Sequence, residues 1–273
     1  MRGCSCRGTS GFAHISCLAE QAKILVDEAE ENNLGVKAEN ERHRRWYNCN
    51  LCKQDHHGVV ACALGWACWK TYLGRPETDR LRCMALTELG SGLSQGGHHE
   101  DALAVKETEL ATKRRLGASE RNILVVQNNL ATTYHALGRL DEALSVRQEV
   151  YSGRLRLDGE ERYMTLAAAS NYAMSLVDLE LFKEARLLMR KMTPVARRVL
   201  GENHDLTLQM RATYAQSLYE DPGATLDDLN EAVTTLEATA RTARRVLGGA
   251  HPLTTTLEDD LQDARATRDA LQE

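Results

Sequence analysis

The sequence is poor in residues that break helices or favour strands: among 273 residues only four are proline and two are phenylalanine. Alanine and leucine are abundant, and this composition favours helix over sheet. No long apolar run is present. The longest, residues 59–69, is far shorter than the roughly 20 residues that a membrane-spanning helix needs. The first residues also contain no apolar stretch typical of an export signal. We therefore expect an intracellular protein, most simply a cytoplasmic one, without a membrane partner.

Positive charge is not in excess, since the formal net charge is −5. A nucleic-acid partner is not expected, because such partners require a basic surface. The motifs of common catalytic sites are also missing: no glycine-rich phosphate loop, no His-Glu-x-x-His and no Gly-x-Ser-x-Gly occurs. The sequence therefore predicts no catalytic residues.

Cysteine and tryptophan are absent from the last 190 residues. All eight cysteines and all three tryptophans lie at or before Cys83. Without an export signal the cysteines are expected as reduced thiols, and closely spaced thiols with histidines among them suggest metal binding. We predict two modules, residues 1–74 and 75–273, with the boundary at a Gly and a Pro in segment 74–77.

The second module contains an internal repeat. Helix-ending glycines at Gly117, Gly159, Gly201 and Gly248 are 42, 42 and 47 residues apart. Acidic-Ala steps ending at Ala102, Ala143, Ala185 and Ala232 are 41, 42 and 47 residues apart. Two independent markers thus agree on one period, and each unit has the apolar spacing of a helix, a short turn and a second helix.

Residues around these glycines fit helix ends. Paired arginines precede Gly117, Gly201 and Gly248, where cations favour the end of a helix and glycine suits the left-handed position that follows. We interpret them as caps rather than as a basic binding patch. His204 and His251 follow two of the glycines and are interpreted as residues at helix starts. Small residues recur in the first helix of each unit and allow close helix approach: Gly90, Ala131, Ala173 and Ala215.

The segments 128–131 (Asn-Asn-Leu-Ala), 137–143 (Leu-Gly-Arg-Leu-Asp-Glu-Ala) and 201–208 resemble the tetratricopeptide repeat in its longer, kinesin-light-chain-like form. The resemblance implies an all-α superhelix of helix-turn-helix units, at about 81–117, 118–159, 160–201 and 202–248, with a capping helix in 249–273. It also implies a concave groove lined by the first helix of each unit.

Mapped onto this sequence, the groove residues are Met84, Thr87, Ser91, Ser94, Val125, Asn128, Thr132, His135, Ala167, Ser170, Met174, Val177, Gln209, Ala212, Gln216 and Tyr219. The peptide-binding candidates among them are Asn128, Thr132, His135, Ser170, Met174, Gln209, Gln216 and Tyr219. The set contains no lysine or arginine, so the basic clamp by which some relatives hold a carboxylate is not expected. We predict that the groove binds a peptide or partner protein; Asn128 either holds its backbone or is only solvated.

The first module carries three short-spaced pairs of metal-ligand residues: Cys4 and Cys6, His14 and Cys17, and Cys49 and Cys52. Zinc takes four thiolate or imidazole ligands in a tetrahedron, and one turn can supply two of them. The pattern therefore predicts zinc as a cofactor.

Together with residues 4–18 and 46–52, these pairs resemble the RING-CH (RING-variant) zinc finger. The resemblance implies one zinc site formed by Cys4, Cys6, Cys49 and Cys52, and half of a second formed by His14 and Cys17. The family's first Cys-x2-Cys pair has no counterpart before Cys4. Either the chain is truncated, or His56, His57, Cys62 or Cys68 supplies replacements. Buried inert thiols are the simpler interpretation of Cys62 and Cys68, because both lie on an apolar helix.

Two functions follow as hypotheses. The first is a protein-interaction scaffold with a zinc-binding, RING-CH-like head. The alternative is an E3 ubiquitin-protein ligase, whose head recruits a ubiquitin-conjugating enzyme while the repeats bind substrate. A RING-type finger has no nucleophile of its own and acts by positioning a loaded conjugating enzyme.

Overall fold

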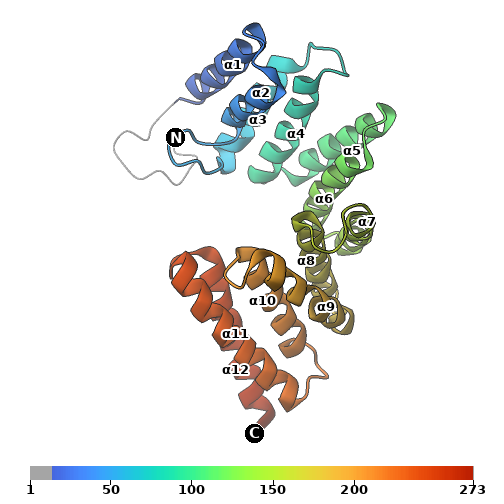
Figure 1. Ribbon diagram of the computed structural model, residues 1–273, viewed down its shortest axis with the longest axis vertical. Helices are drawn as coiled ribbons and strands as arrows, with labels where there is room; N and C mark the ends of the chain where they lie inside the picture. Colours follow the sequence, from blue (N-terminus) through green and yellow to red (C-terminus); the bar gives the residue numbers. More distant parts are fainter. Residues whose placement is uncertain (1–13, 273) are drawn as a thin grey trace. The chain divides into compact units, whose positions relative to one another are not determined.

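The computed structural model describes residues 14–272, and this part of the chain is almost entirely helical (Figure 1). The first helices are α1 (Ile15–Glu31), α2 (Gly35–His43), the short 3-10 helix η1 (Arg44–Trp46) and α3 (Gly58–Tyr72). The remaining helices are α4 (Arg80–Gln95), α5 (His99–Arg115), α6 (Glu120–Ala136), α7 (Leu140–Asp158), α8 (Tyr163–Asp178), α9 (Phe182–Leu200), α10 (Asp205–Tyr219), α11 (Leu226–Leu247) and α12 (Pro252–Gln272). The chain forms two compact units, one ending at Gly138 and the other beginning at Arg139.

The predicted alternation of helices and short turns is confirmed, whereas the bounds of the four units stay predictions. The four predicted units contain α4 and α5, α6 and α7, α8 and α9, and α10 and α11, and the predicted capping helix is α12. The helix ends are also as expected. Gly117, Gly159, Gly201 and Gly248 each adopt a positive φ, between 68° and 94°, within two residues of the end of a helix. At this backbone conformation glycine avoids the strain of a Cβ.

Two helix starts confirm the interpretation of the late histidines. Nδ1 of His204 accepts a hydrogen bond from the backbone N–H of Leu206, at 3.2 Å. Nδ1 of His251 accepts one from the N–H of Leu253, also at 3.2 Å. Each imidazole thus satisfies a backbone donor that a helix leaves unpaired in its first turn.

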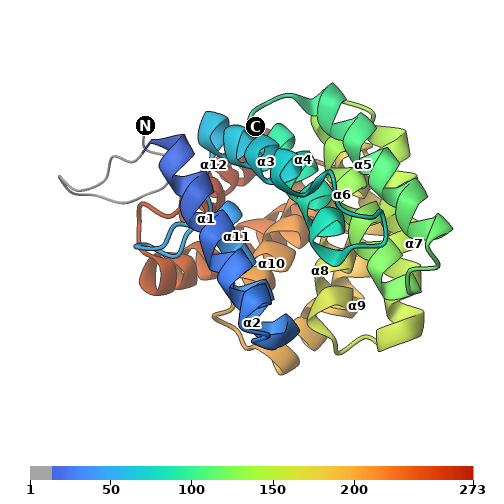
Figure 2. The same ribbon diagram turned by 90° about the horizontal axis from the view of Figure 1, so that it is seen from above.

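In the first unit, α1, η1 and α3 share a core with α4, the first helix of the repeat series. Buried side chains from α1, η1, α3 and α4 form one cluster: Ala22, Val26, Trp46, Cys68, Tyr72, Leu81 and Ala85. Helices α3 and α4 lie side by side (Figure 1, Figure 2). Their contact is close because a Cβ on Gly92 would lie only 2.6 Å from the carbonyl oxygen of Ala61. The packing is therefore continuous across residues 74–75. The module boundary predicted at these residues stays a prediction.

The small residues expected to allow close helix approach are all buried. Ala131, Ala173 and Ala215 are fully inaccessible, and a Cβ on Gly90 would lie 3.1 Å from Cγ of Lys106 on α5. In the second unit, α10, α11 and α12 enclose a cluster that includes Leu236 and Leu257. The C-terminal helix thus covers apolar surface that the last helix pair would otherwise expose.

Buried cations join successive helix pairs, a feature that the sequence analysis missed. In the first unit, Nζ of Lys106 on α5 donates to the hydroxyls of Ser94 and Thr133, both at 2.7 Å. In the second unit, Arg147 on α7 donates to Oγ of Ser175 at 2.7 Å and to the carbonyl oxygen of Asn171. Each cation is only 5% exposed. Because these donors reach the first helix of the next pair, they help to fix how the pairs stack.

Burial lowers the pKa of Lys106 to about 8. The unfolded chain keeps this proton to higher pH, so between pH 8 and 10 it binds more protons than the folded chain. The free energy of unfolding should therefore rise with pH in this range. Relative to Lys106→Met, we expect the wild type to gain roughly 2 kcal/mol between pH 7.5 and 10, measured by chemical denaturation. Lys106→Arg, which cannot deprotonate, should follow the Met variant. Parallel profiles for wild type and Lys106→Met would contradict this expectation.

No helix within residues 14–272 is both long and apolar enough to cross a membrane.

Candidate functional site

In the first unit, the predicted groove residues of α6 lie on one unburied face of the helix. Val125 is 38% exposed, Thr132 is exposed, and Asn128 and His135 are partly exposed. The helix buries its opposite face, because Leu124, Leu130 and Ala131 pack into the interior. The structure therefore brings these four side chains together on a surface that a ligand can reach, neutral in charge and mixed in polarity.

The predicted residues of α4 have other surroundings. The hydroxyl of Thr87 donates to Oε1 of Glu109 at 2.6 Å, and the hydroxyl of Ser94 accepts from Lys106. Both partners are on α5, so these two side chains help to join the helix pair. Met84 packs against the cluster that contains Ala22 and Val26 of α1, and Ser91 lines a pocket between α3 and α4.

In the second unit, the predicted residues divide between surface and interior. Met174 on α8 is 41% exposed and Gln209 on α10 is exposed, while Ala167, Ala212 and Gln216 are partly exposed. Ser170, Val177 and Tyr219 are buried, and here the predicted groove lining needs correction. Helix α8 packs against α7, α9 and α10, which leaves little of its surface free. Tyr219 lies in the core beneath α12, with its hydroxyl 3.4 Å from Asp260.

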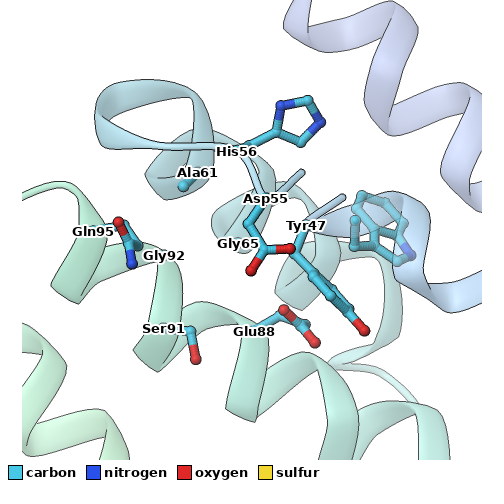
Figure 3. Close-up of a pocket in the computed structure, with 10 residues that line it drawn as sticks. Tyr47, Asp55, His56, Ala61, Gly65, Glu88, Ser91, Gly92 and Gln95 are labelled. Carbon is cyan, nitrogen blue, oxygen red and sulfur yellow. The ribbon is translucent and has the colours of Figure 1, made fainter. Parts of the chain in front are cut away.

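A pocket of about 310 Å³ lies in the first unit, between the loop after η1 and helices α3 and α4 (Figure 3). The loop contributes Tyr47, Asp55 and His56, and α4 contributes Glu88, Ser91 and Gln95. The other lining residues are Trp46, Ala61, Gly65 and Gly92. Figure 3 shows the carboxyl groups of Asp55 and Glu88 facing the same space, with the Tyr47 hydroxyl beside Glu88 and the His56 ring turned away. No lysine or arginine lines this pocket.

The electrostatics of the pocket centre on Glu88. The half-buried carboxyl of Glu88 is partly shielded from solvent and lies near the carboxylates of Asp55 and Glu109, which raises its pKa to about 8. Burial is the main cause, and repulsion by the two carboxylates adds to it. The same environment raises the pKa of the Tyr47 hydroxyl, chiefly through burial and then through Glu88. The pocket therefore contains two acidic side chains, of which Glu88 holds a proton at neutral pH, and no lysine or arginine in its wall.

One tight turn carries the last predicted ligand pair, Cys49 and Cys52. The backbone N–H of Cys49 donates to the carbonyl oxygen of Gln54 at 2.8 Å, and that of Lys53 donates back to Cys49 at 3.0 Å. Lys53 adopts φ of 59°. Cys49 is buried and Cys52 is partly exposed. This turn can supply two thiolates, but their predicted partners Cys4 and Cys6 lie outside the described residues.

The other candidate metal ligands are not gathered into a site. His14 precedes α1, and its Nδ1 lies 4.0 Å from Sγ of the exposed Cys17. Within residues 14–272, no three histidine, cysteine or acidic side chains are arranged to hold a metal ion. This includes the proposed replacements His56, His57, Cys62 and Cys68. The predicted zinc thus stays a prediction that depends on residues 1–13.

Cys62 and Cys68 fit the interpretation as structural thiols. Sγ of the fully buried Cys68 lies 3.8 Å from Nε2 of His43, which is also fully buried. Burial raises the thiol pKa of Cys68 and lowers the pKa of His43 to about 4, so both side chains are neutral at pH 7. Burial, followed by the charge of Asp101, also raises the pKa of Cys62. A raised thiol pKa disfavours the thiolate that binds metals.

A second pocket, of about 370 Å³, lies in the second unit between α9, α10 and α11. Three arginines line it, and each has an acidic partner: Arg190 pairs with Glu231, while Arg197 and Arg211 pair with Glu202. These ion pairs satisfy the cations without a ligand.

The comparisons with known proteins agree with the helix pairs. The family model of the tetratricopeptide repeat matches residues 122–196. This part of the chain consists of tetratricopeptide repeats. None of the curated proteins matches the chain significantly.

Solved structures with the same fold include repeats of a Podosopora anserina protein named as a kinesin light chain. That structure has a TM-score of 0.56 and 18% identity, covering 86% of this chain and 98% of the other. The structure of BtubC (BKLC) from P. vanneervenii has a TM-score of 0.55 and 14% identity, with coverages of 96% and 91%. At these identities the likeness establishes the kinesin-light-chain-like repeat fold alone.

The repeat match covers the helices that carry Asn128, Thr132 and Met174, but not the pocket. Sequence reasoning missed Tyr47, Asp55 and Glu88 as a group, since they are up to 41 residues apart. One available signal was Glu88 itself, an acidic residue next to predicted groove residue Thr87 on a helix rich in apolar and small side chains.

Proposed function

We propose that the protein is an interaction scaffold that binds a peptide or partner protein on the first helices of its tetratricopeptide repeats. The main supporting observation is the accessible, uncharged surface of these helices. In the first unit it comprises the α6 face with Val125 and Thr132, and in the second unit Met174 and Gln209. Exposed apolar side chains beside neutral polar ones suit a ligand that is held by apolar contacts and hydrogen bonds.

Site-specific photo-crosslinking in the full chain tests the scaffold proposal. A benzophenone amino acid would replace Thr132, Met174 or Gln209. In the control, the same amino acid would replace Leu187 on α9, which is 69% exposed. After irradiation in a lysate of the source cells, we expect the three first-helix positions to crosslink a shared partner, and Leu187 not to. Equal labelling from Leu187, or no partner shared by the three positions, would contradict the proposal.

A charge-introducing variant adds an independent measurement. Because Met174 is exposed, Met174→Glu should leave the fold intact while placing a charge on the binding surface. We expect at least a tenfold loss of the crosslinked partner, whereas Leu187→Glu should leave it unchanged. Tenfold corresponds to about 1.4 kcal/mol of binding free energy.

Zinc binding by the head is a second proposal, supported by the turn that carries Cys49 and Cys52. Cys4 and Cys6 would complete the tetrahedral ligand set, and the zinc would then tie the N-terminus to this turn. Native mass spectrometry of the full chain should show one zinc ion per chain, lost in Cys49→Ser and kept in the control Cys83→Ser. A zinc-free wild type would refute the proposal. Two zinc ions would show that His14 and Cys17 also acquire partners.

The ubiquitin ligase alternative depends on this zinc site and on a surface for a ubiquitin-conjugating enzyme. Its test is discharge of ubiquitin from a loaded conjugating enzyme in the presence of the full chain. No acceleration over the uncatalysed rate would rule out this alternative and leave the scaffold proposal unaffected.

A further inference from the structure

The pocket of the first unit lies beside the predicted binding face, because Ser91 belongs to both. Its lining contains two carboxyl groups, two hydroxyls, an amide, the imidazole of His56 and the rings of Trp46 and Tyr47, but no lysine or arginine. The volume of about 310 Å³ is far above the roughly 10–15 Å³ that one water needs and reaches the range of ligand pockets. The cavity is therefore large enough for an organic group.

The two carboxyl groups differ in depth. Asp55 is exposed at the rim, and Oδ1 of its side chain accepts a hydrogen bond from the amide of Asn48 at 3.2 Å. Glu88 is half-buried on α4, and no hydrogen bond or ion pair joins its carboxyl to another residue within 14–272. Elsewhere in the chain, shielded acidic groups have partners. Glu109 is 3% exposed and accepts from Lys113 at 2.7 Å, for example. Glu88 thus has no basic partner, and it holds a proton at neutral pH, for which a bound cation can substitute as the compensating charge.

The missing counter-charge fits an organic cation better than a metal ion. No third acidic, histidine or cysteine side chain joins Asp55 and Glu88 in an arrangement that could hold a metal, as judged over residues 14–272. A guanidinium or ammonium group needs only acceptors around its N–H groups. Both carboxyls can accept, as can the oxygens of Ser91, Gln95 and Tyr47. The rings of Trp46 and Tyr47 add aromatic surface, on which cations are stabilised.

We propose that this pocket binds the side chain of an arginine or lysine on the partner held by the repeats. The inference rests on the proposed scaffold function and adds one chemical requirement, a basic residue that reaches past Ser91 to Glu88. Because the Glu88 carboxyl holds a proton at neutral pH, binding of the cation releases this proton to solvent. The cation then forms charge-assisted hydrogen bonds to the carboxylates of Glu88 and Asp55 in a partly desolvated site, where such bonds are stronger than in water.

The test uses the full chain, labelled with nitrogen-15, and capped tripeptides with a central arginine or lysine. Matched probes carry neutral citrulline or norleucine instead. Amide signals of Gly65 and Gly92 and the indole signal of Trp46 report on the pocket. We expect saturable shifts at millimolar concentrations of at least one basic probe, and at least tenfold weaker binding of its neutral counterpart. Equal binding of the neutral probes, or no saturable shift with either basic probe, would overturn the proposal.

Variants locate the site. Glu88→Gln should weaken the basic probe about tenfold, and Asp55→Asn about threefold because Asp55 is exposed. The control Glu100→Gln, an exposed acidic residue on α5, should change affinity less than twofold. Losses that do not differ between Glu88→Gln and Glu100→Gln would refute the site. Because the probes need no partner protein, failure of the crosslinking experiment and failure of this one are separate outcomes.

Discussion

Gly92→Ala should destabilise the first unit by about 2–3 kcal/mol, although alanine is the better helix former. The new Cβ would lie 2.6 Å from the carbonyl oxygen of Ala61, 3.2 Å from its carbonyl carbon and 3.3 Å from Cα of Cys62. All three are backbone atoms of α3, so no side chain can rotate away and α3 must separate from α4. Overpacking of this kind costs more than the roughly 1 kcal/mol that alanine gains inside a helix.

Tryptophan fluorescence makes the measurement specific to this unit, because Trp46, Trp66 and Trp69 all precede Gly138. We expect the denaturation midpoint reported by fluorescence to fall, while the part of the circular dichroism signal that comes from the second unit is retained. Gly74→Ala is the matched control, since a Cβ there meets nothing within 4 Å. It should change the free energy of unfolding by less than about 0.5 kcal/mol. A more stable Gly92→Ala protein would show that α3 and α4 do not pack this closely.

Glu88→Gln should make the protein more stable, increasingly so as the pH rises. The pKa of the Glu88 carboxyl is raised to about 8 in the folded chain, whereas the same group in the unfolded chain ionises near its ordinary value. Between these two pKa values the folded chain binds more protons. The wild type therefore loses stability as the pH rises from about 4.5 to 8. Glutamine keeps the shape and the hydrogen-bonding capacity of the protonated acid and does not titrate.

We expect the difference in unfolding free energy between Glu88→Gln and wild type to grow by about 2 kcal/mol from pH 5 to pH 8.5. This figure is less than half of what the full pKa difference would give, because the side chain is only half-buried. Denaturant titrations followed by tryptophan fluorescence at several pH values measure it. Glu100→Gln, on the exposed side of α5, should run parallel to wild type. A constant offset between Glu88→Gln and wild type would mean that Glu88 is solvated and keeps its ordinary pKa in the folded chain.

Helix order, repeat period and helix ends were predictable from the sequence alone. The glycines at one period, with arginines before them, predicted the ends of α5, α9 and α11, and the structure confirms these ends. His204 and His251 were also interpreted correctly as residues at helix starts. Each helix end depends on residues within one or two turns of each other, and the period follows from the recurrence of these local patterns along the sequence, so no tertiary contact is needed to predict them.

Only the tertiary structure decided which faces of those helices remain accessible. Tyr219 occupies the same repeat position as His135, which is partly exposed, yet Tyr219 is buried because α12 packs over it. No pattern in the sequence around Tyr219 predicts this contact with α12. The pocket depends in the same way on a loop and a helix brought together from distant parts of the chain, which places Asp55 near Glu88. Caps are local properties of a helix and the period is their recurrence along the sequence, whereas burial and pKa depend on neighbours that the chain supplies only when it folds.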